Sequence, residues 1–528
     1  MLSDSSNNSF SKLATALVDA FENKEIADTD KKITVNVLVS KVAFWYEKLR
    51  TAMDYGTEET VLRRAIERIL KRRLVLDADG KSLAEILVRE LVWAGYFADS
   101  TVPESIIKKV ASSVNLHLRL KNAIISKKTL RGDNVPEFVI QLLSCDIYTI
   151  LLPGKEKEAM SNFMFKILKN SVNIEDDSEQ TRDVQVFIAV RKNFARDDIA
   201  FLRYKLFTQI FGRLTEENLN ETIENFVKGY KEINYQLSYP KKDKIFNHIK
   251  KKTPPFLILY DILMEEKGRI KTLVKHEEDF KIRVFSACSR RYKTINKKVR
   301  TAIIRSFVFI LFTKAFVALF VEGTFEKIFL GQIQWLSIIL NTTIPPFLMI
   351  LAGLGIKTPD SRNSQIIFLD IQRLLLQENP QTTKNLSFRL KSTTPKTIRH
   401  RIFSVLWFLS ILLVFGLIGF ILTKLHFNLL SQGIFLFFIA IVSFLTYRIY
   451  QTASIYTVVT GKQTILNPIV DFFFVPVIRV GRNLTEGISQ VNFILIIIDY
   501  IIEAPFKGFV GFFEQWFLFL ATKREELE

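Results

Sequence analysis

Two consecutive uncharged segments, residues 402–423 and 425–447, most constrain what this chain can fold into. A helix needs about 20 predominantly apolar residues to cross the roughly 30 Å hydrocarbon core of a bilayer. Within hydrocarbon, only a helix or a closed barrel satisfies every backbone polar group. The pair therefore predicts a transmembrane helical hairpin, and basic residues bound it on both sides.

Two more spans are expected upstream of this hairpin, over residues 302–321 and 333–356. The first is interrupted by Lys314, and the second carries Pro345 and Pro346 side by side. Because a proline ring has no N–H and clashes with the preceding turn, we expect a kink or a break in the second span.

The sequence thus predicts an all-α protein in which a helical cytosolic domain precedes a polytopic α-helical membrane domain, because apolar residues recur mostly at helical spacing. The expected divisions are a disordered N-terminus (1–9), a cytosolic helical domain (10–254), a basic helical neck (255–300), a transmembrane domain (301–448) with spans at about 302–321, 333–356, 402–423 and 428–447 and a cytosolic loop at 357–401, and a membrane-associated C-terminal region (449–528).

Two regions next to these spans are expected to lie at the membrane surface. The loop contains a candidate amphipathic helix on the inner face of the membrane, at residues 364–377. The C-terminal region is expected to form interfacial or re-entrant helices, with one extra spanning hairpin as the alternative.

Basic residues set the predicted orientation. Lys and Arg are abundant before the first span and in the loop 357–401, so both regions belong in the cytoplasm by the positive-inside rule. The polar N-terminus has no apolar core after a positive start, so we expect a cytoplasmic N-terminus and no cleavable signal peptide. The predicted location is the inner or plasma membrane, crossed several times.

The segment that enters the first span is strongly basic. Cations near an anionic bilayer surface contribute about 1 kcal/mol each. We therefore expect contacts with anionic lipid headgroups from six residues: Arg290, Arg291, Lys293, Lys297, Lys298 and Arg300.

A second basic segment, VLRRAIERILKRR at residues 61–73, lies within the predicted cytosolic domain. Such a helix can present a solvated face, contact headgroups or follow nucleic-acid phosphates. Glu67 lies among the cations and favours the solvated face. No nucleic-acid-binding motif accompanies the charge, so we expect no nucleic-acid partner.

Lys314 is the residue whose position most needs a physical reason. An ionised lysine in mid-membrane costs about 2.5–3.5 kcal/mol on insertion scales, so it needs a partner or an aqueous cavity. The candidate partners are Glu322, Asp471 and Asp499. The candidate intramembrane polar site comprises Lys314, Glu322, Asn341, Pro345, Pro346, Asp471 and Asp499. An ion path at an interrupted helix is one interpretation, and a buried ion pair that fixes helix packing is the preferred one.

The sequence contains no pattern typical of catalysis or of cofactor binding. Asp77 and Asp79 lack the acidic residue that would complete a calcium loop, and we interpret them as part of a helix–turn–helix connection. No His or Cys spacing suits zinc, and the two cysteines, Cys145 and Cys288, are expected to be reduced. We expect no enzymatic activity, no metal and no cofactor.

The preferred functional hypothesis is a multi-pass membrane protein that displays a helical domain at the cytoplasmic face as a scaffold or assembly platform. Its basic character, 73 Lys and Arg against 54 Asp and Glu, favours anionic partners. Other membrane or cytosolic proteins are the expected partners, and an oligomer is compatible with the pattern. The alternative is a small channel or transporter that uses Lys314 and the proline-interrupted second span.

Overall fold

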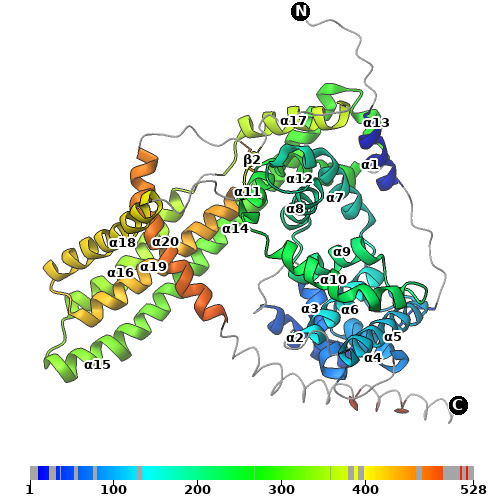
Figure 1. The fold of residues 1–528 in the computed structure, drawn as a ribbon. Coiled ribbons are helices and arrows are strands. Elements are labelled where there is room, and N and C mark those ends of the chain that lie inside the picture. Colours follow the sequence, from blue (N-terminus) through cyan, green and yellow to red (C-terminus); the bar gives the residue numbers. More distant parts are fainter. Residues whose placement is uncertain are drawn as a thin grey trace, which may run out of the picture. The chain divides into compact units, whose positions relative to one another are not determined.

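The computed structural model describes residues 10–22, 31–35, 37–52, 58–74, 80–127, 134–266, 268–356, 358–377, 386–390, 398–458, 466–490 and, near the C-terminus, 512, 513, 516, 519 and 520. Within these residues the chain is mostly helical, as predicted, with two short strands (Figure 1). The predicted disordered segment 1–9 and the pair Asp77 and Asp79 lie outside the described residues.

The chain forms two compact units. The N-terminal unit comprises residues 12–250, 378–390 and 494–528, and the span-bearing unit comprises residues 1–11, 251–377 and 391–493.

The N-terminal unit is built from helices in sequence order. They are α1 (Lys12–Glu22), α2 (Val37–Ala52), α3 (Glu58–Leu74), α4 (Gly80–Trp93), α5 (Ser105–Ser126), α6 (Val135–Leu151), α7 (Lys155–Leu168), α8 (Glu179–Val190), α9 (Ile199–Phe211), α10 (Leu219–Leu237) and α11 (Lys242–Lys252), whose last two residues belong to the other unit.

Two apolar clusters form the core of this unit, and α5 and α6 contribute to both. One cluster joins them to α8, α9 and α10 around Phe138 and Phe226, whose rings meet edge to face at 5.9 Å. The other joins them to α3 and α4, where Ile66 and Leu83 are fully buried. The apolar residues at helical spacing in α3 and α4 are therefore core residues, and their burial is the main favourable term in folding the unit.

The sheet was not predicted and links distant parts of the sequence. Strand β1 (Val172–Ile174) pairs in parallel with β2 (Leu386–Phe388), with Val172 opposite Leu386. The backbone N–H of Leu390 also donates to an Asp176 carboxylate oxygen at 2.6 Å. The segment 357–401, predicted as a cytosolic loop with one helix, therefore also contains a strand that belongs to the N-terminal unit.

The span-bearing unit is built from helices, several of them long (Figure 1). They are α12 (Pro254–Glu266), α13 (Ile270–Leu273), α14 (Glu277–Val317), α15 (Gly323–Phe325), α16 (Trp335–Leu354), α17 (Ser361–Leu376), α18 (Ile398–Lys424), α19 (Leu429–Ala453) and α20 (Leu466–Gln490).

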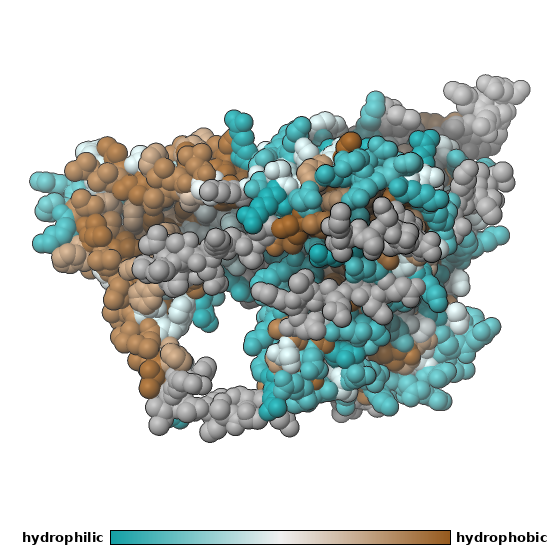
Figure 2. Space-filling view, turned by 90° about the horizontal axis from the view of Figure 1, so that it is seen from above, coloured by the Kyte–Doolittle hydropathy of each residue, from teal (hydrophilic) through white to brown (hydrophobic). Residues whose placement is uncertain are grey.

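Among the described residues, four helices are long and apolar enough to cross a membrane, as the sequence predicts. They cover Glu277–Phe329, Trp335–Leu354, Arg401–Lys424 and Leu429–Ala453. Large apolar side chains such as Phe312, 71% exposed, project from them, and brown apolar surface covers these helices while the N-terminal unit is mainly teal (Figure 2). So much exposed apolar surface is typical of a protein whose solvent is lipid.

Helices α18, α19 and α20 share an apolar cluster formed by Val414, Ala440 and Val477. Gly481 of α20 lies against the backbone of α19, and a Cβ at that position would come within 1.9 Å of the Ala440 carbonyl oxygen. Small residues permit this close approach of helices in membranes.

The predicted neck, residues 255–300, is helical but is not a separate connector. Its second part and the first span form one helix, α14, and α12 packs back against α14. The amphipathic helix predicted on the membrane surface is α17. Its apolar face packs on α12 and α14 instead, with Phe368 5.9 Å from Phe280 between ring centroids. This protein contact buries the apolar stripe, so the stripe is not available to lipid.

Candidate functional site

Lys314 lies inside the helical bundle, where both it and Glu322 have no exposed surface. The Lys314 Nζ and a Glu322 carboxylate oxygen are 3.0 Å apart and form an ion pair. The Lys314 ammonium also lies 4.7 Å from the centre of the Phe438 ring on α19, a cation–π distance. Of the three predicted acidic partners, Glu322 is the one that the structure places against Lys314.

A wide helical turn makes this pairing possible. In a regular α-helix, two residues eight positions apart are about 80° out of alignment around the axis. Here α14 gives way at Ala318 to a π-helical turn (Ala318–Glu322), in which each residue advances by a smaller angle. The Glu322 carboxylate is thereby brought onto the face that carries Lys314. Hydropathy does not report such a turn, although π turns are frequent at functional positions.

Two other helices complete the surroundings of Glu322. The second Glu322 carboxylate oxygen accepts a hydrogen bond from Asn341 Nδ2 of α16 at 2.7 Å and is 3.4 Å from the Ser431 hydroxyl of α19. The same Asn341 amide donates to the Ser431 carbonyl at 3.2 Å. The pair is therefore enclosed by α14, α16 and α19, and its polar groups join these helices.

One more buried carboxylate lies next to this pair. Glu326 follows Glu322 by four residues, has no exposed surface, and begins a second π-helical turn (Glu326–Leu330). Its oxygens accept hydrogen bonds from the Gln334 backbone N–H at 2.7 Å and from Asn428 Nδ2 at 2.6 Å. The sequence placed Glu326 in a loop between spans, so this residue and Asn428 were missed. Asn428 caps α19 by accepting from the Ser431 N–H, a role that Asn is suited to.

The two prolines, at which a kink or a break is predicted, do not break the helix. Helix α16 runs from Trp335 to Leu354 with Pro345 and Pro346 inside it, and both rings are buried. The missing N–H groups deprive the carbonyls of Asn341 and Thr342 of their helical donors. Packing of α16 against α14 and α19 supports the helix through this position, as neighbouring helices do in membrane proteins.

The side chains of the other two acids of the candidate site lie outside the part of the chain that the structure describes. Asp471 belongs to α20, but its side chain is not among the described residues. Asp499 lies outside the described residues altogether.

The six cations expected at the lipid headgroups fall into two groups. Arg290 Nη2 lies 2.7 and 2.6 Å from the two carboxylate oxygens of Glu265, and Arg291 pairs with Asp261. Both acids are on α12. In contrast, the other four take part in no ion pair among the residues that the structure describes, and all are exposed: Lys293, Lys297, Lys298 and Arg300.

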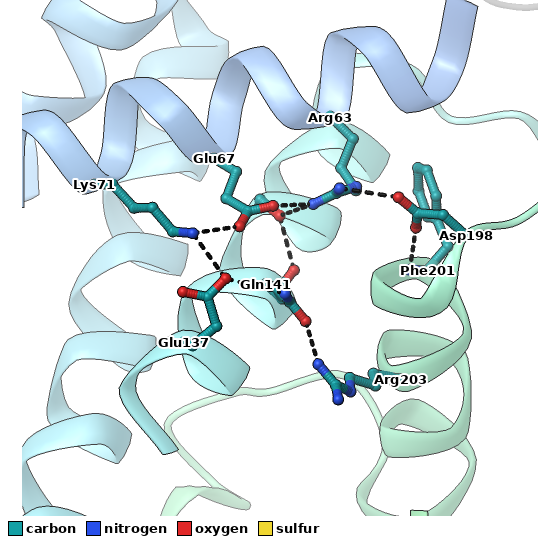
Figure 3. Close-up of polar contacts among 9 residues, drawn as sticks. Arg63, Glu67, Lys71, Glu137, Gln141, Asp198, Phe201 and Arg203 are labelled. Atoms are coloured by element: carbon teal, nitrogen blue, oxygen red, sulfur yellow. Dashed lines mark hydrogen bonds and ion pairs between the residues drawn. The ribbon is translucent and has the colours of Figure 1, made fainter. Parts of the chain in front are cut away.

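The basic segment 61–73 forms most of α3, and its cations are largely paired rather than solvated. Arg63 is buried and reaches an Asp198 carboxylate oxygen at 2.9 Å and the Ser144 hydroxyl at 3.2 Å (Figure 3). It also pairs with Glu67, whose other oxygen binds Lys71 at 2.8 Å. Further along α3, Arg68 pairs with Glu47, and Arg72 pairs with Glu90.

The interpretation of this segment as a solvated face is therefore wrong. Acidic residues of other helices, distant in sequence, neutralise the cations of α3. Burial disfavours the ionised form of Glu67, but Arg63 and Lys71 outweigh that effect and hold the pKa of the Glu67 carboxyl below its usual range. The segment has little free charge to offer a headgroup or a phosphate.

A second buried polar group lies between α5, α6 and α9. The Ser113 hydroxyl donates to Asp146 at 2.6 Å, the Tyr204 hydroxyl donates to Asp146 at 2.7 Å, and His117 Nδ1 lies 2.8 Å from the Ser113 carbonyl. Burial lowers the pKa of the His117 imidazole. Because the Ser113 hydroxyl donates to a carboxylate rather than to the imidazole, this group lacks the arrangement of a nucleophilic triad.

A hollow of about 630 Å³ opens in the N-terminal unit between α8, α9 and α10. Apolar Leu206 and Ile210 line it together with amide side chains such as Gln209 and Asn225, and two carboxylates, Glu221 and Glu232, face it. This hollow could not be predicted from the sequence, because its lining comes from separate helices.

Comparison of the chain with family models, with curated proteins and with solved structures finds no match. Among the residues that the structure describes, no group of three or more His, Cys, Asp or Glu side chains is placed to hold a metal ion.

Proposed function

We propose that the protein is a membrane-anchored platform, whose spans hold the N-terminal unit at the cytoplasmic face, where it binds partner proteins. Four apolar helices of spanning length supply the anchor. The enclosure of the Lys314–Glu322 pair supports a packing role for the charged residues of the spans, since both charges are satisfied by the protein itself.

The hollow between α8, α9 and α10 carries the proposal. Its volume of about 630 Å³ lies within the range of sites that bind ligands in proteins. Apolar side chains beside amides and carboxylates suit an apolar anchor residue of a partner whose flanking groups donate hydrogen bonds. Ile210, a large apolar side chain at this hollow, is 45% exposed and gains from being covered.

Site-specific photo-crosslinking in native membranes tests the proposal. A photoreactive amino acid at Ile210 of the full-length chain is expected to capture a small set of discrete proteins. The matched control places the same group at Ile199, at the other end of α9, which is 59% exposed and does not line the hollow. Identical products from both positions, or none from Ile210, would contradict a platform that binds through this hollow.

A second candidate function, ion or proton passage, has one observation in its favour. Glu326 is buried one turn beyond Glu322 and takes part in no ion pair among the described residues, so this region holds two buried carboxylates, Glu322 and Glu326, and one buried cation, Lys314. Intramembrane ionisable residues commonly mark ion or proton pathways. A flux in vesicles reconstituted with the purified protein, altered by Lys314→Ala, would favour passage over the platform.

A further inference from the structure

Five cations of α14 take part in no ion pair among the described residues, and three of them lie on one face of the helix. At 100° per residue, Lys293, Lys297 and Arg300 fall within an arc of about 60°. Their side chains are exposed, whereas Tyr292, Ile295 and Val299 on the opposite side are buried. No ion pair joins the three cations to an acidic side chain among the described residues. We call Lys293, Lys297 and Arg300 the basic stripe.

Arg290, which precedes the basic stripe on α14, differs from it because its charge is paired. Arg290 lies on the same side of α14, one turn earlier, and Glu265 of α12 binds its guanidinium. The Nη2 group of Arg290 contacts both Glu265 oxygens, and its Nη1 group donates to the Ser286 hydroxyl at 3.0 Å. The acids of α12 thus neutralise the start of the basic segment and leave the basic stripe, nearest the span, with its charge.

The basic stripe continues directly into the apolar surface of the first span. Ile304 lies one turn beyond Arg300, in the same arc, and is 52% exposed. Four residues of helix rise about 6 Å, which is comparable to the thickness of the headgroup region on one side of a bilayer, about 5–8 Å. Long basic side chains reach toward headgroups while their stems lie along apolar surface.

We propose that Lys293, Lys297 and Arg300 form a binding site for the phosphate of an anionic phospholipid. Three unpaired cations on one face match a negative headgroup, and continuity with exposed apolar surface places acyl chains beside Ile304. An acidic protein segment would share the charge but would leave that apolar surface uncovered. The site rests on the membrane placement of the spans that the proposed function assumes, and it is independent of the hollow in the N-terminal unit.

Binding of short-chain phosphatidylglycerol to the full-length protein in neutral detergent tests the site. We expect saturable binding of phosphatidylglycerol and much weaker binding of short-chain phosphatidylcholine. About 1 kcal/mol per cation near an anionic surface corresponds to about fivefold in affinity. The triple variant Lys293→Gln/Lys297→Gln/Arg300→Gln should therefore weaken binding by on the order of 100-fold, and Lys297→Gln alone by about fivefold.

The matched control removes the same charge elsewhere. Lys108, Lys109 and Lys166 of the N-terminal unit are exposed and take part in no described ion pair, so the triple change of these residues to Gln should alter affinity by less than about twofold. An unchanged affinity for phosphatidylglycerol in the stripe variant, or an equal loss of affinity in the control variant, would overturn the site. So would equally tight binding of phosphatidylcholine, or inorganic phosphate that competes as well as the lipid does. Should the triple variant misfold, the single variant decides by the same criterion. Crosslinking from Ile210 is expected to persist in the stripe variant, so the failure of one proposal does not entail failure of the other.

Discussion

The two units each bury a cation within a helix, and they neutralise it differently. In the N-terminal unit, Arg63 has two carboxylates and a hydroxyl from α3, α6 and α9 around one guanidinium. In the span-bearing unit, Lys314 has one carboxylate, Glu322, which lies on the same continuous helix and is held in turn by Asn341. The first arrangement has several partners, whereas the second depends on one.

This difference matters because the surroundings of the two units differ. A charge that loses its partner in the N-terminal unit has water within reach through local opening of the structure. In the membrane placement proposed above, a charge that loses its partner between the spans has only hydrocarbon and neighbouring helices around it. We therefore expect the loss of Glu322 to have a larger effect than the loss of Arg63, and the following tests can break or sharpen that comparison.

The largest effect is expected from Glu322→Leu, which leaves Lys314 buried without its counter-ion. Breaking a buried ion pair by removing one partner costs about 3–5 kcal/mol, and we expect the upper end of that range. Unfolding of the full chain in detergent, followed by intrinsic tryptophan fluorescence, measures the change. The double variant Lys314→Met/Glu322→Leu removes both charges and should recover most of the loss. A single variant no less stable than the double one would show that the pair does not hold the helices together.

The next effect is expected from Arg63→Met, at about 3 kcal/mol. The substitution removes the ion-pair partner of the Asp198 carboxylate, while Glu67 keeps Lys71 as a partner. Resistance of the N-terminal unit to limited proteolysis in the full chain reports the loss. The control is Arg89→Met, which removes a half-exposed i,i+4 pair with Glu85 and should cost less than about 0.5 kcal/mol. Equal effects would mean that the buried network contributes no more than a surface pair.

A moderate pH dependence is expected in the N-terminal unit. Because burial lowers the pKa of His117 in the folded protein, the unfolded chain binds a proton first as the pH falls. Above the usual His pKa of about 6.5, the free energy of unfolding should not depend on His117 protonation. Below it, the free energy of unfolding should decrease as the pH falls, by at most about 1.4 kcal/mol per pH unit for one proton. Melting of the unit followed between pH 8 and pH 5.5 measures this slope. His117→Gln should flatten it, and an unchanged slope in that variant would assign the proton to another group.

The smallest effect is expected from Arg290→Gln, which removes the half-exposed ion pair with Glu265. Such pairs contribute about 0.2–1 kcal/mol, so the stability of the full chain in detergent should change by less than about 1 kcal/mol. Raising the salt concentration should reduce the difference further, because exposed charges are screened. A loss as large as that of Glu322→Leu would show that the pairs between α12 and α14 are as important as the pair between the spans.

Much of the architecture could be predicted from composition along the chain. The spans follow from runs of apolar residues, since about 20 of them in a row have few other stable placements. The buried stripes of α3 and α4 follow from helical spacing, because residues three and four apart share a face. Both are local properties, and the structure contains them where they were expected.

The charged residues were harder to predict. The sequence pointed to a partner for Lys314 but could not choose Glu322, because that pairing depends on a π-helical turn that has no compositional signal. The cations of α3 were expected to face solvent because Asp198 and Glu137, which bind them, lie far away in the sequence. The strand at Leu386–Phe388 was missed for the same reason, since its partner strand is more than 200 residues away.

By itself, the sequence determined that this protein is helical and carries four helices able to cross a membrane, because hydrophobic length and periodicity act within single segments. Only the tertiary structure decided which charges are neutralised and which remain free. Arg63 and Arg290 have acidic partners supplied by the fold, whereas Lys293, Lys297 and Arg300 have none among the described residues. The physical reason is that an ion pair depends on the distance between two groups in space, and that distance is set by helix packing rather than by either residue's neighbours in the chain.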